Sequence, residues 1–137
     1  MTSRRLFTEE DRYRLGHLLA SEDARGTVPW HYLDELEWQL ETTEATEPSA
    51  IPDDIVTMNS TVRLVSSDGA VEALCTVVYP ENVELTDLAV SVLEPFGSRL
   101  LGRRVGDRVE WEERTVEGPW HVAEVVFQPE RVGKFAL

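Results

Sequence analysis

The sequence predicts an α+β protein in which a helical hairpin precedes an antiparallel sheet with one short helix. Apolar residues recur at helical spacing in two stretches before residue 45, and their spacing changes to a period of two from Ile55. Between these parts, residues 41–54 hold two prolines, several acids and no periodicity, as is typical of a linker. We therefore expect two units, a helical hairpin over residues 1–47 and a main domain over residues 48–137.

The first predicted helix begins after Thr8, whose hydroxyl group is suited to accept a hydrogen bond from the unpaired N–H groups of a first helical turn. Acidic residues follow at positions 9–11, where the positive end of the helix dipole favours negative charge. We expect the helix to end between residues 20 and 24. Its apolar stripe is formed by Leu15, Leu18 and Leu19.

A second helix is predicted to begin near Pro29, because proline is tolerated in a first helical turn and Thr27 can cap it. Its apolar positions are Trp30, Leu33, Leu36 and Leu40. Two such helices form a hairpin whose arms are only about 20 Å long. Arms of this length are marginal alone and must pack on each other or on the rest of the chain.

The loop predicted between the two helices, residues 21–26, carries the adjacent acids Glu22 and Asp23. They follow the first helix, whose C-terminal dipole disfavours negative charge, so helix stability does not explain them. Carboxylate oxygens at a hairpin tip can ligate a hard cation such as Mg²⁺ held by a partner. The alternative, which we favour in a chain with 26 acids, is a solvated loop in which Asp23 or Thr27 caps the next helix.

Five strands are predicted in the main domain. Asp68-Gly69 favours a tight hairpin turn between the first two. Pro80–Asn82 and Glu117–Pro119 interrupt the strand pattern, whereas Pro95–Gly97 ends the third strand and begins a short helix. The second strand is largely apolar, so we place it centrally in the sheet. The predicted strands are residues 55–64, 71–79, 88–93, 109–111 and 120–127.

Composition restricts the function. The chain has 26 acidic and 13 basic residues, a net charge of −13, so we expect no strong direct nucleic-acid binding. The three histidines stand on separate elements, and no metal-binding, phosphate-binding or nucleophile–base motif occurs. We therefore expect no enzyme activity, no cofactor and no metal site. Cys75 is the single cysteine, which excludes an internal disulfide. With no membrane-spanning stretch and no signal-peptide pattern, we expect a cytoplasmic protein.

Residues 90–107 combine a strand, a proline stop, a short amphipathic helix and a return strand flanked by glycines. Helical spacing predicts two core residues among Phe96, Leu100 and Leu101. The third, if exposed beside Pro95, would form a binding patch. The main basic cluster of the chain also lies here and consists of Arg99, Arg103, Arg104 and Arg108. These arginines either pair with acids of a partner or balance nearby acids of the same domain.

The same stretch resembles the C-terminal signature of the Gre transcript cleavage factors, in which a strand runs into a proline, a short Leu-rich helix and Gly-Lys-x-x-Gly-Asp. The matching positions here are Pro95, Leu100, Leu101, Gly102, Arg103, Gly106 and Asp107, with arginine in place of the lysine. Residues 55–60, 77–80 and 127–130 are similar to one branch of that superfamily, the regulators of nucleoside diphosphate kinase.

The resemblance implies an FKBP-like C-terminal domain, an N-terminal antiparallel coiled coil, and binding to bacterial RNA polymerase at the rim of its secondary channel. It assigns docking on the polymerase to Leu93, Glu94 and Pro95, and by extension to Phe96. In Gre factors a long coiled coil also delivers tip acids to the polymerase Mg²⁺. The hairpin here is much shorter, so we expect Glu22 and Asp23 not to reach that ion.

The expected function is therefore that of a non-enzymatic transcription regulator, which acts by occupying the secondary channel or by competing with other channel factors. One alternative is a Gre-like transcript cleavage and elongation factor, in which Glu22 and Asp23 steady the polymerase Mg²⁺. Another is a stand-alone FKBP-like isomerase or chaperone, for which the sequence shows no set of aromatic residues that could line an active site.

Overall fold

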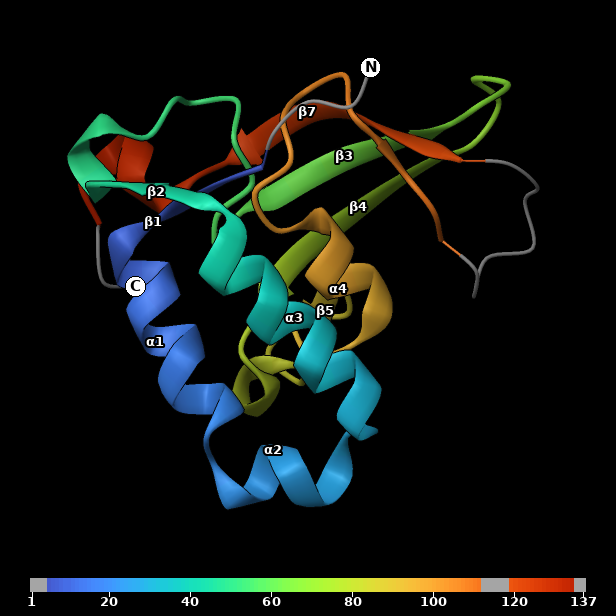
Figure 1. Cartoon of the computed structure of the whole chain (residues 1–137). Helices are drawn as coiled ribbons and strands as arrows, with labels where there is room; N and C mark the ends of the chain where they lie inside the picture. The colour runs from blue at the N-terminus through green and yellow to red at the C-terminus, as the bar shows by residue number, and fades with distance from the viewer. Residues whose placement is uncertain (1–4, 112–118, 135–137) are drawn as a thin grey trace.

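A hairpin of helices and a curled five-stranded sheet make up the structure, a computed structural model that describes residues 5–111 and 119–134 (Figure 1). Helices α1 (Glu9–Leu19) and α3 (Trp30–Thr42) are the arms of the hairpin, and α2 (Glu22–Thr27) joins their ends far from the sheet. Helix α4 (Pro95–Leu100) packs beside the sheet. This is the predicted α+β architecture. No helix in the described residues is both long and apolar enough to cross a membrane.

Both arms of the hairpin begin and end close to their predicted positions. The Thr8 hydroxyl accepts a hydrogen bond from the Asp11 backbone N–H at 3.0 Å, which confirms Thr8 as the cap of α1. Arg12 then ties the arms together, because its Nε donates to the carbonyl oxygen of Leu40 at 2.9 Å and its Nη2 to that of Thr43 at 3.2 Å. The guanidinium thus satisfies carbonyl groups at the C-terminal end of α3, where a cation also suits the helix dipole.

The apolar stripe predicted for α3 is correct except at its first residue. Leu33, Leu36 and Leu40 are buried, but Trp30 is 72% exposed. Trp30 lies in the first turn of α3, beyond the region that the core covers. Thr27 does not cap α3, since it is the last residue of α2, and the N-cap position of α3 is Pro29, without a side-chain hydrogen bond.

The loop predicted over residues 21–26 is wrong, because this segment forms α2. The Ser21 hydroxyl accepts a hydrogen bond from the Ala24 backbone N–H at 3.2 Å and so caps the helix. A serine followed by two acids is itself a helix-start signal. Glu22 and Asp23 therefore occupy the first turn of a helix, where the dipole favours them.

The predicted linker also contains regular structure. Strand β2 (Glu44–Thr46) pairs in parallel with β1 (Leu6–Thr8) at the base of the hairpin, and a 3₁₀ turn, η1 (Pro48–Ala50), follows. Each strand has only three residues, and its partner is 38 positions away, so no local pattern predicts the pair. The division into units at residues 47 and 48 stays a prediction.

The main sheet has the strand order β5-β4-β3-β7-β6, and the predicted second strand, β4, indeed lies inside it. Its turn at Asp68-Gly69 is confirmed, with Gly69 at a φ of +76°. The prediction of a wholly antiparallel sheet is wrong, because β4 and β5 pair in parallel. The strands are β3 (Thr61–Ser66), β4 (Glu72–Val78), β5 (Ala89–Ser91), β6 (Arg108–Val109) and β7 (Trp120–Phe127).

Four of the five predicted strands are shorter in the structure, all but the last, and one predicted turn lies mostly outside the described residues. Strand β3 begins at Thr61 and not at Ile55; the preceding buried segment is irregular, with Asn59 at a φ of +65°. Strand β6 ends at Val109, before Trp111. Of the turn predicted at residues 117–119, only the last residue is described. The 3₁₀ turns η2 (Pro80–Asn82) and η3 (Pro129–Val132) follow β4 and β7.

The hairpin and the sheet share one hydrophobic core. Leu15 and Leu33 of the hairpin belong to the same buried cluster as Leu64 and Trp120 of the sheet. At the junction, Gly102 has a φ of +81°, and a Cβ atom there would lie 2.6 Å from the ring of Phe7. Gly102 also accepts a hydrogen bond from the backbone N–H of Leu6, so β1 packs directly on the chain that follows α4.

A buried acid provides the polar part of this junction. Asp11 is 4% exposed, and its Oδ2 accepts a hydrogen bond from the Met58 backbone N–H at 3.1 Å. Nearby, the Thr57 hydroxyl donates to Oε1 of buried Glu130 at 2.6 Å. Burial raises the pKa of Asp11 to about 6, although the Met58 N–H opposes that shift. Ionised Asp11 is therefore less favourable in the folded protein than in the unfolded chain.

The first prediction concerns the pH dependence of stability. Because the pKa of Asp11 is raised on folding, its stabilising contribution is complete below about pH 4 and is lost as the pH rises through about 6. Asp11→Asn keeps an oxygen for the Met58 N–H but cannot ionise. We expect its stability relative to wild type to increase by about 2 kcal/mol between pH 4 and pH 7.5, measured by urea denaturation.

The matched control is Asp34→Asn, at an exposed position of the same hairpin, which should show no such pH-dependent difference. Asp11→Ala leaves the buried Met58 N–H without an acceptor and should cost about 1–3 kcal/mol. A constant difference between Asp11→Asn and wild type over this pH range would contradict the prediction.

Candidate docking site

The loop between β5 and α4 carries the four residues to which the resemblance assigns docking. The backbone and the side chain of Ser91 both fix the shape of this loop. The Ser91 hydroxyl accepts a hydrogen bond from the Leu93 N–H at 3.1 Å, and the Ser91 carbonyl oxygen accepts one from the Glu94 N–H at 3.0 Å. Pro95 then opens α4 in the first turn, where its restricted φ suits a helix. The loop is therefore held rigidly where it reaches the surface.

Gly97 permits the close approach of α4 to β5. A Cβ atom at this position would lie only 2.1 Å from the carbonyl oxygen of Ser91 and 3.2 Å from Cα of Val92. Both neighbours are backbone atoms, which cannot move aside as the end of a side chain can. The glycine is thus required by space, and the course of the loop depends on it.

The four predicted docking residues differ in accessibility. Glu94 is exposed and Pro95 is half-buried, whereas Leu93 is only 8% exposed. Phe96 is 2% exposed, and its ring stacks on Trp111 with 3.9 Å between centroids. Phe96 therefore contributes to the core that supports the loop.

The prediction of a binding patch formed by one exposed apolar residue beside Pro95 is wrong, because all three candidate residues are buried. They are Phe96, Leu100 and Leu101. The helix packs closely enough on the sheet to cover them all.

The exposed side of the loop borders a groove with a volume of about 360 Å³, which we call the junction groove. Its walls come from three separate segments, namely the start of α3, the turn η2 and the β5–α4 loop. No sequence pattern predicts it, because the two main walls are about 60 positions apart. It is lined by Val28, Pro29, Tyr32, Pro80, Val83, Ser91, Leu93, Glu94 and Pro95.

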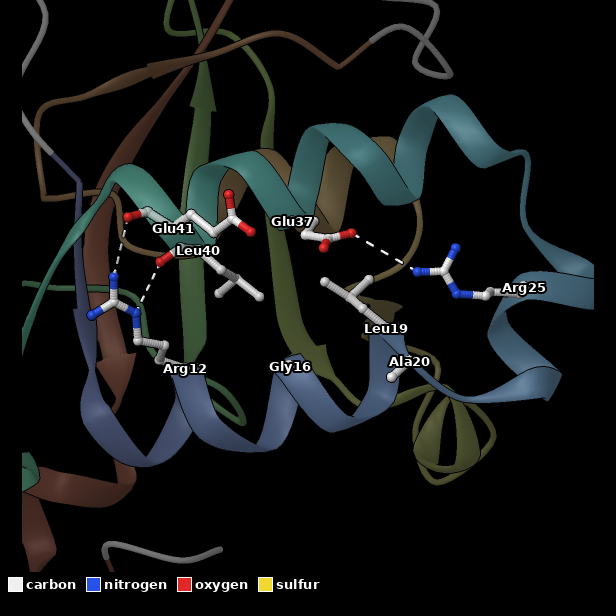
Figure 2. A pocket seen from close by; sticks show the side chains of 8 residues that line it. All are labelled: Arg12, Gly16, Leu19, Ala20, Arg25, Glu37, Leu40 and Glu41. Atoms are coloured by element: carbon white, nitrogen blue, oxygen red, sulfur yellow. Dashed lines mark hydrogen bonds and ion pairs between the residues drawn. The ribbon is translucent and has the colours of Figure 1, made fainter.

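A second cavity, of about 470 Å³, lies between α1 and α3 (Figure 2). Arg12 crosses it to the carbonyl oxygens of Leu40 and Glu41, and Arg25 approaches Glu37 at 3.9 Å. Arg12 thus joins α1 to the end of α3, and Arg25 brings α2 close to α3. The cavity is accordingly explained by closure of the hairpin, and none of the predicted docking residues lines it.

One arginine of the basic cluster, Arg103, and the nearby Arg5 make hydrogen bonds within the chain. Arg103 Nε donates to the carbonyl oxygen of Arg99 at 3.0 Å, and Arg5 Nη1 donates to that of Ser98 at 2.9 Å. Both carbonyl groups belong to the last turn of α4. Burial, with neighbouring Arg103, lowers the pKa of Arg5 to about 10. These two contacts stabilise the end of α4 within the chain; they involve carbonyl groups, whereas the interpretation of charge balance invokes nearby acids.

Comparison with known proteins places this fold in a class of transcription factors. The family model described as "Transcription elongation factor, GreA/GreB, C-term" matches residues 51–126, more than half of the chain and the whole of the β5–α4 loop. The chain belongs to the GreA/GreB family of transcription elongation factors.

Two curated relatives are named regulator of nucleoside diphosphate kinase, from Escherichia coli strain K12 and Shigella flexneri. Each is 39% identical over 106 residues, which cover 76% of this chain and 77% of the relative. A solved structure, a prokaryotic transcription elongation factor GreA/GreB from Nitrosomonas europaea, is 34% identical, with a TM-score of 0.76 over 92% of this chain and 100% of that one. These relatives are named as regulators or elongation factors, not as catalysts. The coiled-coil and FKBP-like descriptions stay predictions.

The second prediction tests the steric role of Gly97. Gly97→Ala should destabilise the protein by about 1–3 kcal/mol, because the added methyl group meets the Ser91 backbone. Gly16→Ala is the control, since nothing lies within 4 Å of its Cβ position and alanine favours the helix by about 0.5–1 kcal/mol. In urea denaturation, the midpoints of the two variants should therefore differ from that of wild type in opposite directions. A Gly97→Ala protein as stable as wild type would contradict the geometry.

Proposed function

We propose that the protein is a non-enzymatic transcription regulator that binds bacterial RNA polymerase at the rim of the secondary channel through Leu93, Glu94 and Pro95. Membership of the GreA/GreB family supports the choice of partner. The observation that carries the assignment is the rigid β5–α4 loop, which presents Glu94 and Pro95 at the surface above a packed core. We also propose a cytoplasmic location, where such a polymerase works.

The regulator would act by occupancy of the channel entrance or by competition with other channel factors. Its hairpin arms have 11 and 13 residues, so they are about 16 and 20 Å long. Both arms also bury leucines in the common core, among them Leu15 and Leu33. A short hairpin packed on the body of the protein is suited to fill an entrance. It is poorly suited to extend toward a distant reaction centre.

A second candidate function is Gre-like transcript cleavage, with Glu22 and Asp23 placed near the polymerase Mg²⁺. The observation in its favour is that α2, which carries both acids, lies at the end of the hairpin farthest from the five-stranded sheet (Figure 1). The position of both acids in the first turn of α2 weakens this argument, because the helix dipole already accounts for negative charge there.

The third prediction concerns binding through the loop. Wild-type protein should bind immobilised bacterial core polymerase in an interferometry assay, and Glu94→Lys should weaken binding at least tenfold by reversing an exposed charge of the docking loop. Glu47→Lys changes the same charge at an exposed position outside the junction groove and should have little effect. Absence of wild-type binding at micromolar concentration would refute the proposed function.

The fourth prediction separates the two candidate functions. With stalled elongation complexes, wild-type protein should leave the transcript at its full length and should reduce the cleavage stimulated by an added Gre factor. The Glu22→Ala/Asp23→Ala variant should compete equally well. Transcript shortening by the wild type that disappears in this double variant would instead establish the cleavage function.

A further inference from the structure

We propose that the hairpin completes the docking surface, and that the junction groove takes an apolar side chain of the polymerase that is flanked by basic residues. In this arrangement Trp30 and Tyr32 of α3 contact the partner together with Glu94 and Pro95. The inference rests on the proposed function, because it names the second half of the same docking surface and the chemistry of the polymerase segment that fits it.

The two walls of the junction groove explain why the hairpin takes part. One wall is the β5–α4 loop, with Leu93 and Pro95, and the other is the start of α3, with Pro29 and Tyr32. Pro80 and Val83 close the groove between them. A segment that enters far enough to contact Leu93, which is only 8% exposed, must also pass the hairpin wall.

Trp30 supports the same conclusion independently. It directly follows Pro29 of the groove wall, and its side chain is 72% exposed. Because Trp30 precedes Leu33 by three residues, it continues the apolar face of α3 past the edge of the core. Its only ring contact among the described residues is an edge contact with neighbouring His31. Exposed tryptophans beside a groove are typical anchors of protein interfaces.

Charge defines the chemistry of the occupant. Glu94 lines the junction groove, and the segment that supplies Val83 carries three further exposed acids, Glu81, Glu84 and Asp87. Among the described residues that line the groove, none is basic. Apolar walls select an apolar side chain, while the acidic surroundings favour lysine or arginine beside it and repel an acidic segment. A basic segment of the polymerase therefore fits, and nucleic acid does not.

The fifth prediction uses two tryptophans of one helix. Trp30→Ser and Tyr32→Ser should each weaken binding to immobilised core polymerase at least tenfold. Trp38→Ser is the matched control, because Trp38 is 60% exposed on the same helix but lies eight positions beyond Trp30, away from the end of α3 that borders the junction groove. The affinity of this variant should change less than twofold. Circular dichroism and urea denaturation should show that the three variants remain folded, since none of these side chains is fully buried.

The assignment of a basic occupant is tested by changing the salt concentration and by neutralising acids beside the junction groove. Raising NaCl from 50 to 300 mM should weaken wild-type binding, and Glu84→Gln/Asp87→Gln should make binding weaker and less dependent on salt. An affinity independent of salt would overturn the assignment of a basic occupant.

The outcomes distinguish this inference from the proposed function. If wild type binds and Glu94→Lys disrupts binding while Trp30→Ser and Tyr32→Ser do not, docking by the loop stands and the hairpin wall is refuted. Equal losses in Trp30→Ser and Trp38→Ser would also refute the junction groove, because they indicate a diffuse contact along α3. If wild type does not bind at all, the proposed function itself fails.

Discussion

The hydrogen bond between the buried Asp11 carboxyl group and the Met58 backbone N–H links the hairpin to the segment that leads into the sheet, and the junction groove forms between these two parts. The groove has one wall from each part, so its width is set by how α1 and α3 sit against the body of the protein. Apolar packing alone would tolerate small shifts of one surface over another. A directional hydrogen bond inside the core, together with the close fit of Phe7 against Gly102, fixes the position more narrowly.

This arrangement also has an energetic consequence. An ionised carboxylate is costly to bury, and the hydrogen bonds with Met58 and Thr8, together with nearby Arg14, offset only part of the cost, so the pKa of Asp11 remains raised. The junction is therefore maintained against an unfavourable charge at neutral pH. The common core, from Leu15 in the hairpin to Trp120 in the sheet, must supply the compensating stability. Hairpin and sheet are consequently coupled in their folding as well as in their geometry.

Local signals in the sequence predicted the elements that local interactions determine. The cap at Thr8, the turn at Asp68-Gly69 and the helix that begins at Pro95 all follow from properties of adjacent residues, and all occur in the structure. Apart from α2, whose cap at Ser21 is a local signal, the errors arose where distant segments decide. Strand β2 exists because β1 pairs with it, and β5 runs parallel to β4 because the chain returns through η2. The docking role proposed for Leu93–Pro95 comes from resemblance, whereas the junction groove is visible only in the tertiary structure.

The hairpin wall of the junction groove, which the sequence did not predict, bears on what the hairpin can do. A hairpin that served as a free probe would need arms that are stable by themselves, and helices of 11 and 13 residues are marginal in water. Here the arms gain stability by packing on the sheet, which removes their freedom to extend. The same packing places Pro29 and Tyr32 opposite Leu93 and thereby creates a wall of the groove. The short arms and the hairpin wall of the junction groove are therefore two results of one structural constraint, and both fit the proposed occupancy better than delivery of acids to a distant centre.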